Sequence, residues 1–214
     1  MFYKIPLIIL VTIMAILSPV YFSWYKPKFK VPANKTYKNI PGKNSDLFIK
    51  LRSKAGNLKE FIIGKGYNPE ICFLIDMSIE SGRNRFFVYD MKNDSVLLSG
   101  LVAHGSCDDG FKTNVTFSNE INSGCSSFGK YKIGNAYYGR FGMAYKLYGL
   151  DSSNRNAFKR SVVLHSYDCV PEQEIYPLPI CNSRGCAMIS PGFMNCLKPV
   201  INTSSKPVLL WIFQ

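Results

Sequence analysis

Short runs of β-branched and aromatic residues dominate the chain from residue 71 to its end, and they constrain its fold more than any other feature. Each run has roughly the length of one strand, and the turn sequences SGR and KNDS separate the first three. The runs occupy residues 71–79, 84–91, 95–105, 128–135, 143–150, 161–168 and 206–213. The pattern therefore predicts a mostly β domain.

A helix is expected in front of these strands. Ser45 is a suitable N-cap, Asp46 places an acid in the first turn, and apolar residues recur with helical spacing as far as Ile62. The sequence GKG at 64–66 is typical of a helix end. A second, short helix is expected over 191–201. The polar segment 106–127 between the strands is predicted to be a long loop, and long loops in compact domains are often functional.

The first 24 residues form a separate unit. Lys4 precedes an apolar run over residues 5–24, which is the layout of a signal peptide. The run is also long enough for an uncleaved membrane anchor, and the absence of a small-x-small cleavage site favours the anchor. Both interpretations predict export to the periplasm or cell envelope, the second with a tether to the inner membrane. A basic linker over 25–44 and a domain over 45–214 complete the expected organisation.

Positive charge is concentrated behind the apolar run. Residues 26–65 contain eleven Lys or Arg and two acids, in a chain whose net charge is +12. Such a stretch fits either an anionic lipid or polymer surface or simply a solvated linker and helix face. No arginine-rich run, zinc finger or RNP-like sequence is present, so nucleic acid is not an expected partner. The sequence predicts no particular oligomeric state.

The seven cysteines set a second constraint, because an odd number leaves at least one thiol outside intramolecular disulfides. An oxidising compartment permits disulfides, although sequence does not fix their connectivity. Two pairings are hypothesised here: Cys107 with Cys125 across the long loop, and Cys169 with Cys181. The second pairing would leave Cys186 free.

Cys186 belongs to a set of residues with a coherent chemistry. The two histidines, His104 and His165, each end an apolar run, and Ser183 follows His165 by 18 residues and begins the sequence Ser-Arg-Gly-Cys. An imidazole can generate a thiolate, and a glycine allows the backbone to turn sharply beside a substrate. Backbone N–H groups at Gly185 and Cys186 can face a developing oxyanion. This combination favours acyl transfer through a thioester.

The arrangement of His165 followed by S-R-G-C resembles the signature of L,D-transpeptidases with the YkuD fold. The segments LVAHG, FSNEINSGCSSFGKY, YGRFGMAYKLYGL and VVLHSYDCVPE resemble, in that order, the murein L,D-transpeptidase catalytic domain. The resemblance covers residues 45–213. It implies a β-sandwich or barrel-like catalytic domain with an N-terminal helix, acting on the stem peptides of peptidoglycan in the cell wall without a cofactor.

By this resemblance, Cys186 is the nucleophile and His165 is the general base. Ser183 shapes the site, Gly185 and Cys186 supply backbone donors, and His104 is assigned to the substrate site. Arg184 departs from the family pattern, and it is expected either to hold a substrate carboxylate or to be a solvated loop arginine. The cysteine would attack the third residue of a stem peptide, release the terminal D-alanine and pass the acyl group to a neighbouring stem amine, which forms a 3→3 cross-link.

Other interpretations stay open. Arg184 stands where many relatives have histidine, and Met188 where they have arginine, which is compatible with an inactive wall-binding protein of the same fold. Water in place of the amine would give an L,D-carboxypeptidase. A zinc site built from His165, Cys169, Cys181 and Cys186 has ligands of the right type but looser spacing than a typical knuckle, so no metal is expected.

Overall fold

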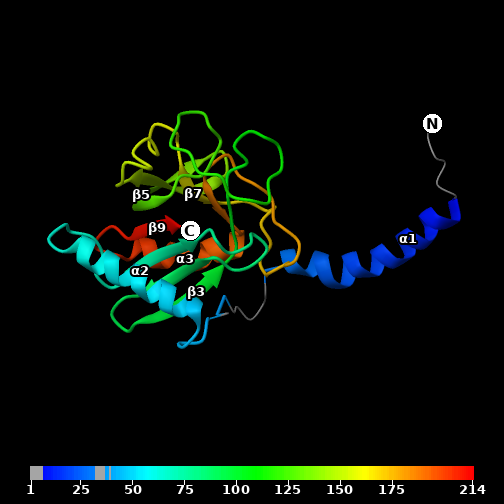
Figure 1. Cartoon of the computed structure of the whole chain (residues 1–214), viewed down its shortest axis with the longest axis horizontal. Coiled ribbons are helices and arrows are strands. Elements are labelled where there is room, and N and C mark those ends of the chain that lie inside the picture. The colour runs from blue at the N-terminus through cyan, green and yellow to red at the C-terminus, as the bar shows by residue number, and fades with distance from the viewer. Residues whose placement is uncertain (1–6, 32–36, 39) are drawn as a thin grey trace.

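The N-terminal segment stands apart from the rest of the molecule. The computed structural model describes residues 7–31, 37–38 and 40–214. Helix α1 (Leu7–Val20) extends away from the domain, and π-helical and 3₁₀ turns follow it over Tyr21–Tyr25 and Lys26–Phe29 (Figure 1). Among the described residues, no helix has both the length and the apolar character needed to cross a bilayer. The segment expected to be a signal or anchor lies partly outside this description, at residues 1–6.

Nine strands form a single sheet within the described part of the chain. They are β1 (Ile71–Asp76), β2 (Phe86–Asp90), β3 (Ser95–Gly100), β4 (Val102–Ala103), β5 (Gly129–Gly139), β6 (Gly142–Gly149), β7 (Val163–Ser166), β8 (Ala187–Ile189) and β9 (Leu209–Phe213). Every run that the sequence pattern assigns to strand overlaps at least one of them. The predicted β-rich class is therefore confirmed.

The strand order explains the barrel-like shape. The sheet runs β3-β2-β1-β9-β5-β6-β7-β8-β4, so its two edges are β3 and β4. These edge strands are separated in the chain by Leu101 alone, which requires the sheet to curl until its ends lie next to each other. The pairs β1–β9 and β7–β8 are parallel and the others antiparallel.

The boundaries differ from the sequence pattern in three places. The run over 95–105 is divided into β3 and β4, because the chain changes from one edge of the sheet to the other at Leu101. The runs over 128–135 and 143–150 lengthen into one hairpin, β5–β6, whose tip is Arg140-Phe141. Strand β8 lies in no predicted run. It has three residues, and its strand conformation is set by pairing with β7 and β4.

The helices cover opposite faces of the sheet. Helix α2 (Asp46–Ile62) begins as predicted, since the Ser45 hydroxyl accepts a hydrogen bond from the Phe48 N–H at 3.2 Å. Its buried face packs on a cluster that includes Cys72 and Leu74 of β1. Helix α3 (Pro191–Asn202) packs on the other face, where Phe193 joins a core cluster with Phe73 of the same strand. Successive β1 residues thus contribute to two different cores.

Part of the expected linker contacts the domain. Tyr37 is buried, its ring lies 5.2 Å from that of Phe193, and its hydroxyl donates to the Glu172 carboxylate. Glu172 also accepts from the Ser190 hydroxyl and from the Gly192 N–H at 2.8 Å, at the start of α3. A carboxylate at this end of a helix is favourable because the first N–H groups lack intrahelical partners. Residues 32–36 and 39 lie outside the description.

Candidate active site

Cys186 lies directly before β8, in a turn that Ser183 organises. The Ser183 hydroxyl donates to the Cys186 carbonyl at 2.7 Å and accepts from the Gly185 N–H at 3.1 Å. The Ser183 N–H donates to the His104 carbonyl at 2.8 Å, and the Ser183 carbonyl accepts from the Ser106 N–H. Ser183 therefore fixes the turn to the segment that follows β4. The thiol is partly buried and belongs to neither disulfide.

Gly185 occupies a position where a side chain would be unfavourable, both for the backbone conformation and for the space available. Its φ is +101°, which is unfavourable for residues with a side chain. A Cβ built there would lie 2.5 Å from the Cys125 carbonyl oxygen and 3.2 Å from Nη2 of Arg160. The backbone beside Cys186 thus packs closely against residues that arrive from two distant parts of the chain.

The pairing of β7 with β8 brings Cys186 next to the strand that carries His165. Leu164 pairs with Ala187, and His165 pairs with Met188. Because side chains alternate along a strand, Leu164 and Ala187 point into the core while His165 and Met188 point to the other face. Cys186 directly precedes Ala187, in the bend before β8. The Val163 N–H, one residue before Leu164, interacts with its thiol.

The surroundings of His165 define its tautomer. Nδ1 lies 3.1 Å from the Ser166 carbonyl oxygen, and a carbonyl can only accept a hydrogen bond. The hydrogen of the neutral ring is therefore assigned to Nδ1, which leaves the lone pair on Nε2. The Phe141 ring stacks on the imidazole, and burial lowers the pKa of His165. A neutral imidazole with an open Nε2 is the form that acts as a base.

The environment of Cys186 keeps its thiol protonated at rest. Burial raises the pKa of Cys186, and the Val163 N–H and the Arg160 cation oppose this rise only in part. The Sγ lies 3.9 Å from the Ser161 carbonyl oxygen, a weak acceptor contact for an S–H group. A thiol in this state needs a base to become a nucleophile.

His104 has its backbone at the site and its ring elsewhere. The ring is fully buried, with Nδ1 3.0 Å from Nη2 of Arg85 and Nε2 3.3 Å from the Asn182 amide nitrogen. Burial, followed by the charge of Arg85, lowers the pKa of His104 to about 4. Since a guanidinium can only donate, Nδ1 is the acceptor and the ring is neutral. Nε2 therefore carries the hydrogen, and behind the Ser183 turn the ring interacts with Arg85 and with the backbone of Lys112 and Asn114.

Arg184 extends into solvent beside a basic hollow. Its side chain is 82% exposed and forms an ion pair with Asp108 at 3.1 Å. The two residues line a hollow of about 400 Å³ together with Asn122, Gly124 and Arg160. A hollow with two guanidinium groups and one carboxylate on its walls suits an anionic ligand group. Because its side chain is exposed, Arg184 can leave its ion pair with Asp108 and bind such a group instead.

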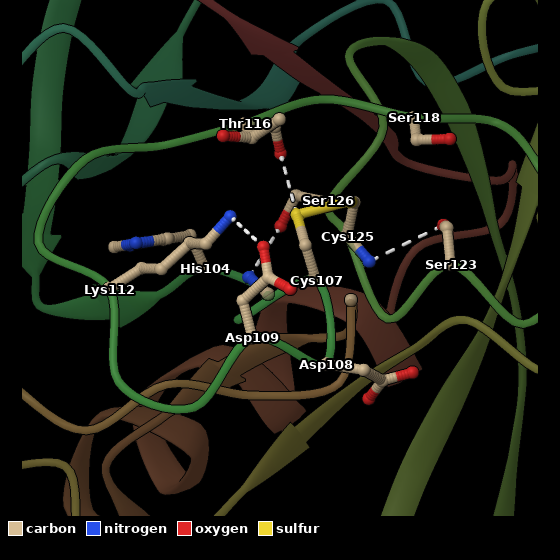
Figure 2. The surroundings of a disulfide bond; sticks show 12 residues. His104, Cys107, Asp108, Asp109, Lys112, Thr116, Ser118, Ser123, Cys125 and Ser126 are labelled. Atoms are coloured by element: carbon tan, nitrogen blue, oxygen red, sulfur yellow. Dashed lines mark hydrogen bonds and ion pairs between the residues drawn. A yellow bond between two sulfur atoms is a disulfide. The ribbon is translucent and has the colours of Figure 1, made fainter.

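Both hypothesised disulfides are present. Cys107 is joined to Cys125, and Cys169 is joined to Cys181. Figure 2 shows the first of them between the segments that carry Thr116 and Ser123. Because Cys169 and Cys181 are bonded to each other, they cannot supply the thiolates of the zinc arrangement considered from the sequence. That alternative is wrong.

Two neighbours of the site had no clear signal in the sequence. Arg160 is one basic residue among several in RNAFKRS, and its contacts depend on the long loop folding back over it. Phe141 lies at the β5–β6 tip in the sequence GRFG. The flanking glycines indicate a turn there, but they do not reveal that the ring covers His165.

Comparisons with known proteins give a match to one family. The family model described as "L,D-transpeptidase catalytic domain" matches residues 48–213. No curated protein matches the chain significantly. Among solved structures, an L,D-transpeptidase from Mycobacterium smegmatis is 12% identical with a TM-score of 0.41, over 68% of this chain and 59% of that one.

Two further solved structures show the same level of similarity. A helical cell shape determining protein from Campylobacter jejuni is 12% identical with a TM-score of 0.40, over 76% of this chain and 56% of that one. An L,D-transpeptidase from Xylanimonas cellulosilytica is 13% identical with a TM-score of 0.38, over 72% and 68%. The chain covers 59% of the Mycobacterium smegmatis protein and 49% of an enzyme whose structure is that of an avibactam carbamoyl form.

Proposed function

The chain belongs to the family of L,D-transpeptidase catalytic domains, and from this premise we propose that it joins peptidoglycan stem peptides by cysteine acyl transfer, forming 3→3 cross-links. The observation that carries the proposal is the pairing of β7 with β8, which places Cys186, directly before β8, next to the strand that carries His165. A thiol that burial keeps protonated and a neutral imidazole with an open Nε2 are complementary partners for this chemistry.

The reaction proceeds in two balanced halves. His165 Nε2 takes the Cys186 proton as Sγ bonds to the carbonyl carbon of the third stem residue, and the resulting imidazolium gives that proton to the departing D-alanine nitrogen. A thioester remains. The amine of a second stem then attacks the thioester while His165 accepts its proton, and the proton returns to Sγ as the C–S bond breaks. No cofactor is required.

The Cys186 N–H is the backbone donor that we propose for the oxyanion of each tetrahedral intermediate. The Gly185 N–H already donates to the Ser183 hydroxyl at 3.1 Å, so its role is to hold the turn. Ser183 and Gly185 thus act by orienting the backbone of Cys186. A preformed donor of this kind stabilises developing charge without reorganisation at the moment of reaction.

The basic hollow is the proposed position of a stem-peptide carboxylate, with Arg184 as the group that moves to bind it. His104 supports the site through its carbonyl, which accepts from the Ser183 N–H. Two disulfides are typical of proteins in an oxidising compartment, which supports location in the cell envelope. A membrane tether through residues 5–24 belongs to this proposal as well.

The test incubates the purified protein with tetrapeptide muropeptides and identifies the products by mass spectrometry. Wild type should yield 3→3 dimers, and C186A and H165A should yield none while remaining folded. C196A is the matched control, because Cys196 also lies outside both disulfides but belongs to α3. It should retain activity. Dimers made by C186A would refute the proposal.

The same assay separates the alternatives. Tripeptides without dimers would identify an L,D-carboxypeptidase, in which water resolves the thioester. A carbapenem provides the remaining distinction, because an active thiol forms a covalent adduct with it. A wild-type protein that stays unmodified and produces neither dimers nor tripeptides would be an inactive wall-binding protein.

A further inference from the structure

Arg160 connects the segment before β7 to the long loop. Its guanidinium donates to the Ser118 carbonyl at 2.7 Å, to the Ser123 hydroxyl at 3.2 Å and to the Ser127 hydroxyl at 3.3 Å. It also donates to the Cys125 carbonyl. One partly buried side chain thus holds four acceptors, all of which belong to the segment 118–127. Such a set of contacts fits the planar fork of arginine, with its five N–H donors.

These contacts reach the reactive turn through Cys125. The Cys125 carbonyl lies between Arg160 and Gly185, since a Cβ at Gly185 would be 2.5 Å from that oxygen and 3.2 Å from Nη2 of Arg160. Moving the carbonyl or the guanidinium would therefore open space next to the backbone of Cys186. The disulfide to Cys107 anchors the same residue from its side chain (Figure 2).

Arg160 is also the cation whose charge acts on the thiol. Its positive charge acts to lower the pKa of Cys186 and so favours the thiolate. The same interaction acts to raise the pKa of Arg160. Other charged or titratable groups around the site are His165 on β7 and the Arg184–Asp108 ion pair at the rim of the hollow. Tyr131 on β5 and Glu120 also interact with Arg160. Arg184 is largely exposed, so solvent screens its charge more than that of Arg160.

We propose that Arg160 is a positioning residue for Cys186: it clamps the Cys125 carbonyl against Gly185 and keeps a fixed positive charge beside the reactive thiol. This inference rests on the proposed function in taking Cys186 as the reactive group. It extends that function by giving Arg160 two tasks toward Cys186, one geometric and one electrostatic.

The experiment follows alkylation of Cys186 by iodoacetamide as a function of pH in the full chain, with peptide mapping to identify the modified thiol. R160M and R160Q both remove the charge, and Gln retains an amide donor for the Cys125 carbonyl. In both variants the midpoint of alkylation should move upward by about half a pH unit or more, which is roughly a threefold loss of thiolate near neutral pH. If R160M does not fold, R160Q carries the test alone.

Two comparisons make the outcome specific. R160K keeps the charge and should restore the wild-type midpoint. R155Q removes a charge from an exposed residue of the same segment and should leave the midpoint unchanged. A wild-type midpoint in R160Q, with the protein folded, would overturn the inference. Because alkylation reports on the thiol alone, a shifted midpoint in a protein that makes no dimers would refute the proposed reaction and leave the role of Arg160 intact.

Discussion

The ring of Phe141 stacks on the imidazole of His165, with centroids 4.7 Å apart and planes inclined by 23°. Phe141 lies at the tip of the β5–β6 hairpin, and its other close neighbour is Tyr167, at 5.6 Å between ring centroids. The pairing of Ala144 with His165 places the β6 side of this hairpin next to β7. The solvent access of the proposed base is therefore set by a hairpin tip rather than by its own strand.

Replacing Phe141 by Ala should raise the pKa of His165. Burial is the main cause that lowers this pKa, and loss of the stacked ring lets water reach the imidazole, which favours its protonated form. NMR titration is suited to the measurement because the chain contains only two histidines. Y138A is the matched control, since Tyr138 lies on the same hairpin and is 80% exposed. A His165 pKa that does not change in F141A would show that Phe141 does not limit solvent access.

Gly185→Ala should disturb the site more than a similar change at another positive-φ glycine. Both Gly185 and Gly110 have positive φ, so alanine costs about 1 kcal/mol of backbone strain at either position. At Gly185 the new Cβ would also meet the Cys125 carbonyl at 2.5 Å, whereas nothing lies within 4 Å at Gly110. Carbapenem acylation of Cys186 should be lost in G185A and kept in G110A. Equal acylation of the two variants would contradict the tight packing beside Cys186.

The buried His104 should make stability depend on pH. Its pKa falls from 6.5 to about 4 on folding, so the unfolded chain binds this proton between those values and the folded chain does not. The contribution of His104 to the free energy of unfolding is therefore fully present above pH 6.5. It is lost as the pH falls toward 4, by on the order of 3 kcal/mol. Urea unfolding of wild type and H104N across this range isolates the contribution, because the other titrating groups are common to both. Parallel curves for the two proteins would refute it.

The parts of the fold that depend on local chemistry could be predicted from the sequence. The Ser45 cap, the apolar stripe of α2 and the strand runs are properties of neighbouring residues, and the structure confirms all three. Strand β8 could not be predicted in this way, because three residues carry too little periodicity. It is a strand only because the β7 register and the return of β4 place partners on both sides of it.

The same distinction applies to the candidate site. His165 precedes Cys186 in the chain, and the recognisable sequence Ser-Arg-Gly-Cys ends at the cysteine. Their roles could therefore be proposed from the sequence. Phe141 and Arg160 influence these residues only through tertiary contacts. The ring of His104 shows the opposite case, since a family-like segment suggested a substrate-site role and the ring instead faces Arg85.

Removing either disulfide should lower the stability of the protein by a similar amount, but only removal of Cys107–Cys125 should change the reactivity of Cys186. They join cysteines 18 and 12 residues apart, and loops of this size are worth roughly 3 kcal/mol each. C107S/C125S should also slow alkylation of Cys186, because it releases the residue whose carbonyl packs against Gly185. C169S/C181S should leave alkylation close to wild type, because the loop it frees keeps buried apolar anchors such as Ile175 and Ile180. The comparison uses denaturant unfolding and Cys186 alkylation rates of both double variants, measured without reductant. Equal alkylation rates in the two variants would show that the Cys107–Cys125 bond does not act on the site.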